Sequence, residues 1–291
     1  MLDDLDSVPS RALARELAAL SAHEMVAALG VRRGPAFLRQ GLALPFYAAS
    51  RTLGRTLAEL DANVSTRGLP AAARRALSCF GVALRTSGAS AGSGPLLVLA
   101  NHPGAYDALS LMSALERKDL LILAADRRFL RALPRLSAHF LFVGDSAGQR
   151  AGALKRALTH LRRGGALLHF PAGQIEPDAD FEPDQARWLE PWQPGVSALV
   201  DACARVDGRV LVAGVRGVHS PRAKRWLLNR AAERRGITTL SPLLQMLGNL
   251  RDVATSVSSL DLGNARQLRA LSASERQPHL REALRRAIGR G

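Results

Sequence analysis

The sequence repeats a short, unbroken run of apolar residues, and a stretch with helical periodicity separates most of these runs from the next. The run at residues 96–100 reads Leu-Leu-Val-Leu-Ala. Runs in which apolar and polar residues do not alternate are typical of strands that are buried on both sides, as in parallel sheets. Four further runs share this character: residues 120–125, 140–143, 166–170 and 210–215.

Helical stretches between these runs complete the pattern. They are predicted at residues 107–116, 151–163 and 196–204, with one more strand at 252–258 and a basic terminal helix at 274–288. Alternation of strand and helix predicts an α/β fold, with a largely parallel sheet covered by helices on both faces.

The first 90 residues have a different character and are predicted to be helical. Apolar residues recur at helical spacing from residue 10 to 30, from 37 to 60 and from 70 to 80. The stretch at 37–60 mixes aromatic residues with arginines, so it is either a helix packed on the core or an interfacial helix that meets lipid headgroups. A Gly/Ser/Ala segment at 87–94 suggests a boundary between an N-terminal helical region (1–90) and an α/β domain (91–291).

The charge balance favours anionic partners. Lys plus Arg number 40 against 25 Asp plus Glu, a formal charge of +15, and only three of the 40 are lysines. Guanidinium groups suit bidentate contact with phosphates and carboxylates, so we expect an anionic membrane surface or an acidic carrier protein as a partner. Aromatic residues are not interleaved with arginines as in a base-stacking platform, so no nucleic acid is expected.

Two cysteines are too few for a disulfide framework or a four-cysteine zinc site, and no cluster of residues suggests any other metal. The first residues, Met-Leu-Asp-Asp-Leu-Asp, are acidic, unlike the basic start of a secretory signal peptide. No window of about 18 apolar residues predicts a transmembrane helix. The sequence therefore predicts a cytoplasmic protein that, if it meets a membrane, lies on its surface.

The first buried run ends in Asn-His-Pro-Gly-Ala-Tyr-Asp, which places His102 and Asp107 five residues apart around a turn. A carboxylate folded back onto the imidazole would fix its tautomer and leave the other ring nitrogen to take a proton. The alternative is a histidine in a turn, with a carboxylate at the start of the next helix. A second run ends in Phe-Pro-Ala-Gly-Gln at 170–174, which is either an ordinary tight turn or a place where backbone amides approach a ligand.

Taken together, the His-x4-Asp motif and the Phe-Pro-x-Gly motif some sixty residues later resemble those of the lysophospholipid/glycerol-phosphate acyltransferase (PlsC-like) family. Residues 142–145 and 192–195 fall where further motifs of that family lie, so the resemblance covers about residues 80–262. It implies acyl transfer from acyl-CoA or acyl-carrier protein without another cofactor, with His102 as general base and Asp107 orienting it. It also implies that other motif residues line the substrate groove: Asn101, Gly104, Tyr106, Phe170, Pro171, Gly173 and Gln174.

The departures from the family pattern concern the acceptor. Ala172 and Ile175 stand where the family has Glu and Arg, and no arginine adjoins Asp145. Candidates to replace the phosphate-binding arginines are Arg127, Arg128 and Arg150, which are equally consistent with solvated surface charge. The acidic segment 176–178 is either a surface loop or a contact for a cationic headgroup, and amides near residues 104 or 173 are candidates for an oxyanion hole.

These observations predict a peripheral membrane acyltransferase of phospholipid biosynthesis, which acylates a hydroxyl of a lysophospholipid, glycerol phosphate or related polar lipid without an acyl-enzyme. An acyltransferase for a non-phosphate acceptor, an amine or a glycolipid, is the alternative that the missing arginines favour. A third alternative is a catalytically decayed, basic membrane-binding protein. The sequence argues against it, because both members of the His/Asp pair are intact.

Overall fold

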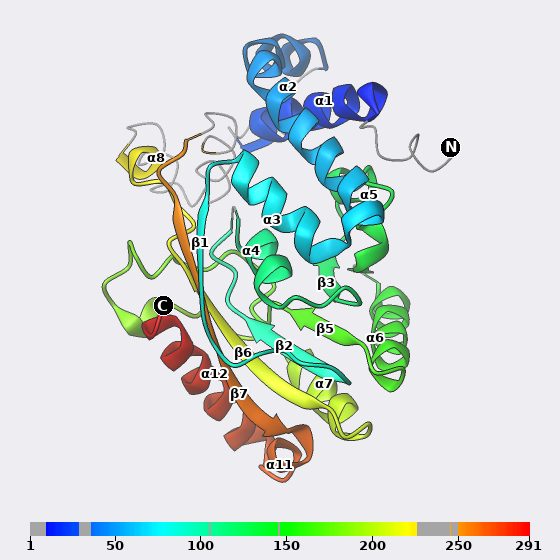
Figure 1. Cartoon of the computed structure of the whole chain (residues 1–291), viewed down its shortest axis with the longest axis vertical. Coiled ribbons are helices and arrows are strands. Elements are labelled where there is room, and N and C mark those ends of the chain that lie inside the picture. Colours follow the sequence, from blue (N-terminus) through cyan, green and yellow to red (C-terminus); the bar gives the residue numbers. More distant parts are fainter. Residues whose placement is uncertain (1–9, 29–35, 105, 145, 226–244, 246–249) are drawn as a thin grey trace.

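The computed structural model of this chain describes residues 10–28, 36–104, 106–144, 146–225, 245 and 250–291, without the side chains of 24, 25, 27, 28, 36–46, 48, 49 and 273. In the described part, seven strands form one sheet in the order β1-β7-β6-β2-β5-β3-β4 (Figure 1). They are β1 (Ala83–Gly88), β2 (Leu96–Ala100), β3 (Leu121–Ala125), β4 (Phe140–Val143), β5 (Ala166–His169), β6 (Arg209–Arg216) and β7 (Ala254–Asn264).

Helices precede the sheet and connect its strands. The longer ones are α1 (Arg11–Ala28), α2 (Ala36–Arg67), α3 (Leu69–Cys79), α4 (Asp107–Ala114), α6 (Ala147–Arg162), α7 (Gly195–Ala204) and α12 (Ala273–Gly289). Short helical turns are α5 (Arg128–Arg131), η2 (Leu136–His139), η3 (Gln185–Arg187), α8 (Pro221–Arg225) and α11 (Ala265–Arg269).

The sheet is parallel from β6 to β4 and changes direction once, because β7 pairs with β6 in the antiparallel sense. The predicted α/β fold with a largely parallel sheet is confirmed. All five parallel strands therefore end at the same edge of the sheet, where loops of open α/β proteins gather functional residues.

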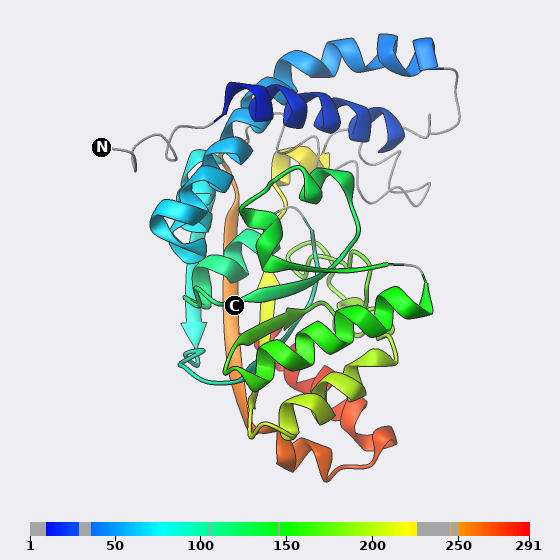
Figure 2. The same cartoon turned by 90° about the vertical axis from the view of Figure 1, so that its right-hand side faces the viewer.

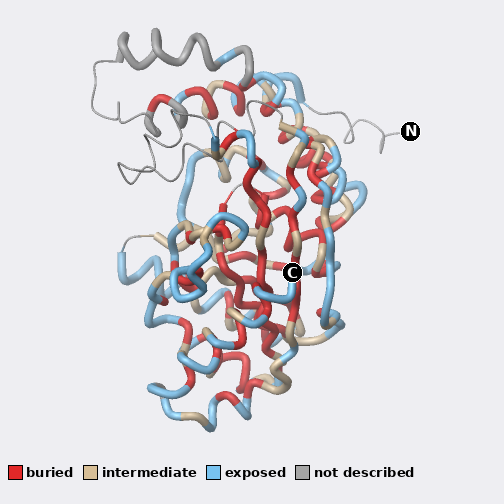
Figure 3. The backbone as a smooth tube through the Cα atoms, turned by 90° about the vertical axis from the view of Figure 1, so that its left-hand side faces the viewer, coloured by how far each residue is buried: buried red, intermediate tan, exposed pale blue. Residues whose placement is uncertain are grey.

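Alternate residues of the central strands supply two separate cores. In β2, Leu96 and Val98 face the core shared with α2, α3 and α4, whereas Leu97 and Leu99 face the core shared with α6, α7 and α12. Figure 2 shows α3 on one side of the sheet and α6 and α7 on the other, and Figure 3 shows the buried strands between them. This double burial explains why the strand at 96–100 has no polar face.

The N-terminal helices pack on the same core as the sheet. Leu57 and Leu60 of α2 belong to the cluster that contains Val98 of β2. The buried carboxylate of Asp61 accepts the backbone N–H groups of Arg135 and Leu136, which joins α2 to the segment before β4. The aromatic and arginine side chains expected at the membrane interface between 37 and 46 lie outside the described residues. Tyr47, next to them, is 38% exposed.

Several elements differ from the prediction, among them β1, α6 and β7. Strand β1 lies in the segment that was predicted to be helical. Only its first two residues are apolar and almost all of it is exposed, so no apolar run marks it, and only pairing with β7 makes it a strand. Helix α6 begins four residues earlier than expected, because Ser146 and Gln149 form a capping box. Strand β7 extends to residue 264. The division into two domains at residue 90 stays a prediction, although the sheet starts before it.

Within the described residues, no helix has both the length and the apolar character that crossing a membrane requires.

Candidate active site

Asn101 ties the end of β2 to the neighbouring strand β6. Its Nδ2 donates to the carbonyl oxygen of Val215 at 2.8 Å, and its Oδ1 accepts the backbone N–H of Val215 at 2.7 Å. The residue is 1% exposed, so its amide serves here to hold two strand ends in register. A contact between Asn101 and substrate stays a prediction.

The turn after Asn101 brings His102 and Asp107 together. Gly104 has a φ of 91°, which favours glycine, and its carbonyl oxygen accepts the N–H of Asp107, the first residue of α4. The Oδ2 atom of Asp107 lies 2.7 Å from Nδ1 of His102 and also accepts the N–H of Gly104 at 2.7 Å. The contact that the five-residue spacing predicted is therefore present.

The two side chains differ in exposure, and this difference shapes their chemistry. The imidazole of His102 is 31% exposed and the carboxylate of Asp107 only 2%. Burial lowers the pKa of His102, but the charge and hydrogen bond of Asp107, with the charge of Glu176, outweigh it and raise the pKa above its usual value. In the neutral imidazole, Nδ1–H donates to Asp107, so the proton-accepting nitrogen is Nε2.

The loop after β5 lies against the same histidine. The ring centroid of Phe170 is 4.5 Å from that of His102, so this aromatic side chain forms one wall beside the imidazole. Pro171 and Ala172 are buried, whereas Gly173 and Gln174 are exposed. The structure thus brings both motifs to one place, as the resemblance implied.

The two amides considered for an oxyanion hole are already bonded within the chain. The N–H of Gly104 donates to Asp107, and the N–H of Gly173 donates to the carbonyl oxygen of Phe170 at 3.1 Å. These two N–H groups each close their own turn. That backbone amides near residues 104 or 173 form an oxyanion hole stays a prediction.

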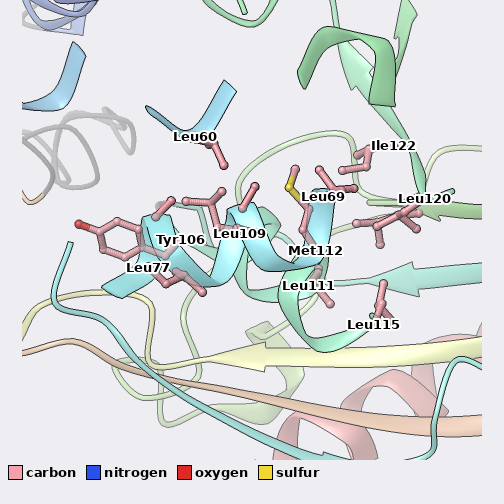
Figure 4. Close-up of a cluster of buried hydrophobic side chains, with 14 of the residues drawn as sticks. Leu60, Leu69, Leu77, Tyr106, Leu109, Leu111, Met112, Leu115, Leu120 and Ile122 are labelled. Carbon is pink, nitrogen blue, oxygen red and sulfur yellow. The ribbon is translucent and has the colours of Figure 1, made fainter. Parts of the chain in front are cut away.

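Tyr106 occupies the core. Its side chain is fully buried, and its ring lies 5.3 Å from that of Phe80, centroid to centroid. Figure 4 shows it in the same buried cluster as Leu77 and Leu109. Tyr106 thus anchors the start of α4 to α3, and burial raises the pKa of its hydroxyl. The predicted contact with substrate is untested.

Glu176 is a site residue that the sequence did not reveal. Its Oε2 accepts the backbone N–H of His102 at 2.8 Å, and its Oε1 accepts the N–H of Glu190 at 2.9 Å. The residue is 2% exposed, and burial raises the pKa of its carboxyl to about 7. Nothing in a Glu-Pro-Asp segment indicates burial, because the partners come from residues 74 positions before it and 14 after it.

Asp178 on the same loop is also buried and holds a different segment. Its two oxygens accept the backbone N–H groups of Gly217, Val218 and His219 at 2.8–3.1 Å. The segment 176–178 is therefore neither an open acidic loop nor a contact for a cationic headgroup, since Glu176 and Asp178 bond backbone amides inside the protein.

The candidate arginines lie at the same sheet edge but away from His102. Arg127 and Arg128 are exposed just beyond β3, two strands from β2, and Arg150 is exposed in the first turn of α6, beyond β4. At about 4.8 Å per strand, β3 and β4 lie about 10 and 14 Å from β2. The structure therefore does not bring these arginines into contact with the His/Asp pair, and their binding of a phosphate stays a prediction.

A cavity of about 450 Å³ opens between the ends of β3 and β4 and the start of α6. Arg131 and Arg156, which were not singled out in the sequence, line it. Arg131 is paired with Asp126 through two hydrogen bonds and stacks on Phe142. Of the two arginines, Arg156 therefore has fewer interactions with the described residues. His102 is not among the residues that line this cavity.

Within the described residues, no three His, Cys, Asp or Glu side chains gather in a way that would hold a metal ion.

Comparison with known proteins agrees with the motifs. Residues 81–208 match the family model described as Acyltransferase. Among solved structures, the chain is similar to the 1-acyl-sn-glycerophosphate (LPA) acyltransferase PlsC from Thermotoga maritima, with 14% sequence identity, a TM-score of 0.46 and coverage of 97% of this chain and 98% of that chain. No curated protein matches the chain. The matched segment contains His102, Asp107 and the loop after β5, so this part of the chain is similar to the acyltransferase family.

Proposed function

We propose that this protein transfers a fatty acyl group from a thioester, acyl-CoA or acyl-carrier protein, to the hydroxyl of a lysophospholipid, glycerol phosphate or related polar lipid. The observation that carries the proposal is the pair of His102 and Asp107, with Nδ1 and Oδ2 2.7 Å apart, the carboxylate buried and the imidazole partly open to solvent. This is the arrangement that a general base requires.

The chemistry follows from the two ring nitrogens. Nε2 of His102 takes the proton of the acceptor hydroxyl while the oxygen attacks the thioester carbonyl. Asp107 holds Nδ1–H and stabilises the imidazolium that forms. When the tetrahedral intermediate breaks its C–S bond, the imidazolium returns the proton to the thiolate. The proton leaves with the thiol and the acyl group leaves with the acceptor. The scheme therefore requires no acyl-enzyme and no metal.

A second acceptor class is supported by one specific observation. Ile175 and Ala172 stand at two charged positions of the family pattern, and the arginines considered as replacements lie strands away from His102. A glycolipid hydroxyl or an amine would need no phosphate site. A peripheral position on an anionic membrane is supported by the charge of +15 and by the resemblance.

The test is an acyl-transfer assay with labelled acyl-CoA and acyl-carrier protein against a panel of phosphate-bearing, glycolipid and amine acceptors. We expect product with a phosphate-bearing acceptor and its loss in His102→Ala. Product formed only with uncharged or amine acceptors would favour the second class. Full activity of His102→Ala would overturn the assignment of the base, and flotation with anionic liposomes tests membrane attachment separately.

A further inference from the structure

Glu176 is a buried carboxylate to which the proposed chemistry gives no task. It lies in the loop after β5 and is bonded only to backbone groups: its oxygens accept the N–H of His102 and the N–H of Glu190. A buried carboxylate costs free energy unless its oxygens are bonded, and here both are. Glu176 is thus bonded to the backbone of His102, the residue on whose position the proposed reaction depends.

Glu176 bonds both backbone polar groups of His102, the N–H and the carbonyl oxygen. The side chain of Glu176 accepts the N–H of His102 at 2.8 Å, and the backbone N–H of Glu176 donates to the carbonyl oxygen of His102, also at 2.8 Å. The imidazole is held separately, by Asp107 and the ring of Phe170. Backbone and side chain of His102 are therefore fixed by different residues.

The C-terminal helix supports this arrangement from outside the segment that matches the family model. Arg281 of α12 donates to the carbonyl oxygens of Glu190 and Leu189 at 2.6 and 3.0 Å. Glu190 in turn donates its N–H to Glu176. A continuous set of hydrogen bonds thus runs from α12 through the 189–190 segment and Glu176 to the backbone of His102.

The charges around the two residues are few. Asp107 from the start of α4 and Glu176 from the loop after β5 both act on the imidazole of His102 and favour its charged form. Arg281 from α12, with the charged form of His102, favours the ionised form of Glu176 and opposes the effect of burial. In its ionised form, Glu176 is thus a second negative charge, besides Asp107, that acts on the imidazole of His102.

We propose that Glu176 is a positioning residue for His102: it fixes the backbone of the histidine and, when ionised, adds a second negative charge to that of Asp107. This inference rests on the proposed role of His102 as the base. Two consequences follow. Loss of the charge lowers the pKa of His102, because a nearby carboxylate stabilises the imidazolium. Loss of the backbone contact displaces Nε2 and lowers kcat without a matching change in KM.

The experiment compares three variants of the full chain. Glu176→Gln removes the charge with little change in shape. Glu176→Asp keeps the charge but is one methylene shorter, so it is expected to lose one of the two backbone contacts. Asp178→Asn is the matched control, because Asp178 is equally buried on the same loop and bonds four backbone amides, none of them of His102. Circular dichroism and thermal melts establish that each variant is folded.

The first readout is the pKa of His102 from NMR titration of the imidazole signals, assigned with His102→Ala. We expect Glu176→Gln to lower this pKa by about half a unit or more, less than the 1–3 units of a carboxylate in direct contact. Glu176→Asp and Asp178→Asn should leave it near the wild-type value. An unchanged pKa in folded Glu176→Gln, or an equal shift in Asp178→Asn, would overturn the proposal.

The second readout is the kinetics of acyl transfer. We expect kcat to fall about 10- to 100-fold in Glu176→Gln and Glu176→Asp, with KM nearly unchanged. If Glu176→Gln does not fold, the loss of kcat in Glu176→Asp carries the test, and wild-type kcat there would refute positioning. The NMR titration needs no substrate, so it tests the effect of Glu176 on His102 whether or not His102 is the catalytic base. Failure of the proposed function and failure of this inference therefore give different results.

Discussion

Oδ2 of Asp107 lies 2.7 Å from Nδ1 of His102 and 2.7 Å from the backbone nitrogen of Gly104, so one oxygen bonds both the imidazole and the turn that presents it. The carboxylate is therefore fixed before any substrate arrives. A pair of this kind gives catalysis through orientation, since the imidazole does not have to find its tautomer or its direction in each cycle.

Replacing Asp107 by Asn is expected to lower kcat by about 10²- to 10⁴-fold. An amide does not stabilise the imidazolium, and its NH₂ group favours the wrong tautomer of His102. Steady-state acyl-transfer kinetics would measure this. Asp207→Asn is the control, because Asp207 is an exposed carboxylate with a φ of 54°, which Asn adopts as readily as Asp. Equal kinetics of the two variants would contradict the role given to Asp107.

The pH dependence of acyl transfer follows from the raised pKa of His102. A general base acts in its neutral form, so kcat/KM is expected to rise with pH and to reach half its plateau above the ordinary histidine value of about 6.5. Asp107→Asn removes the largest interaction that raises this pKa, so the same limb should move to lower pH. A rate profile measured at constant ionic strength tests both; a wild-type midpoint below 6.5 would contradict the prediction.

Asn101→Ala is expected to destabilise the protein and to slow the reaction together. The substitution leaves the N–H and the carbonyl oxygen of Val215 without their side-chain partner, at about 1–3 kcal/mol for each buried group. Urea unfolding measures the loss. The control is Asn63→Ala, whose amide donates only to Glu59 on the same helix and which should cost well under about 1 kcal/mol. Similar losses in both variants would mean that the β2–β6 contact contributes little.

Gly214→Ala should be strongly destabilising, because a Cβ at position 214 of β6 would overlap with the backbone of Ala287 and Ile288 in α12. Overpacking of this kind costs about 1–3 kcal/mol, and here the neighbour is backbone that does not rotate away. Gly152→Ala in α6 has no atom within 4 Å of the new Cβ and should instead stabilise the protein by about 0.5–1 kcal/mol. Thermal melts of the two variants would show opposite shifts; a stable Gly214→Ala protein would contradict the close packing of α12 on β6.

The elements that the sequence predicted correctly are those whose pattern depends on burial. The run at 96–100 is a strand with both faces in a core, and the Pro-Gly turn after it does bring His102 to Asp107. Strand β1 was missed, because an exposed edge strand of Ala, Leu, Arg, Thr, Ser and Gly has no apolar periodicity. Its hydrogen bonds to β7 join residues about 170 positions apart, which no local pattern reports.

For the site, short-range chemistry was determined by the sequence and long-range chemistry by the fold. The five-residue spacing and the turn predicted the His/Asp contact, since their geometry is local. The resemblance carried by this motif together with the motif after β5 then identified the pair as the candidate catalytic residues. That Glu176 and Asp178 are buried against backbone amides of distant segments was decided only in the tertiary structure. A polar group's role depends on its partners, and these come from segments that only folding brings together.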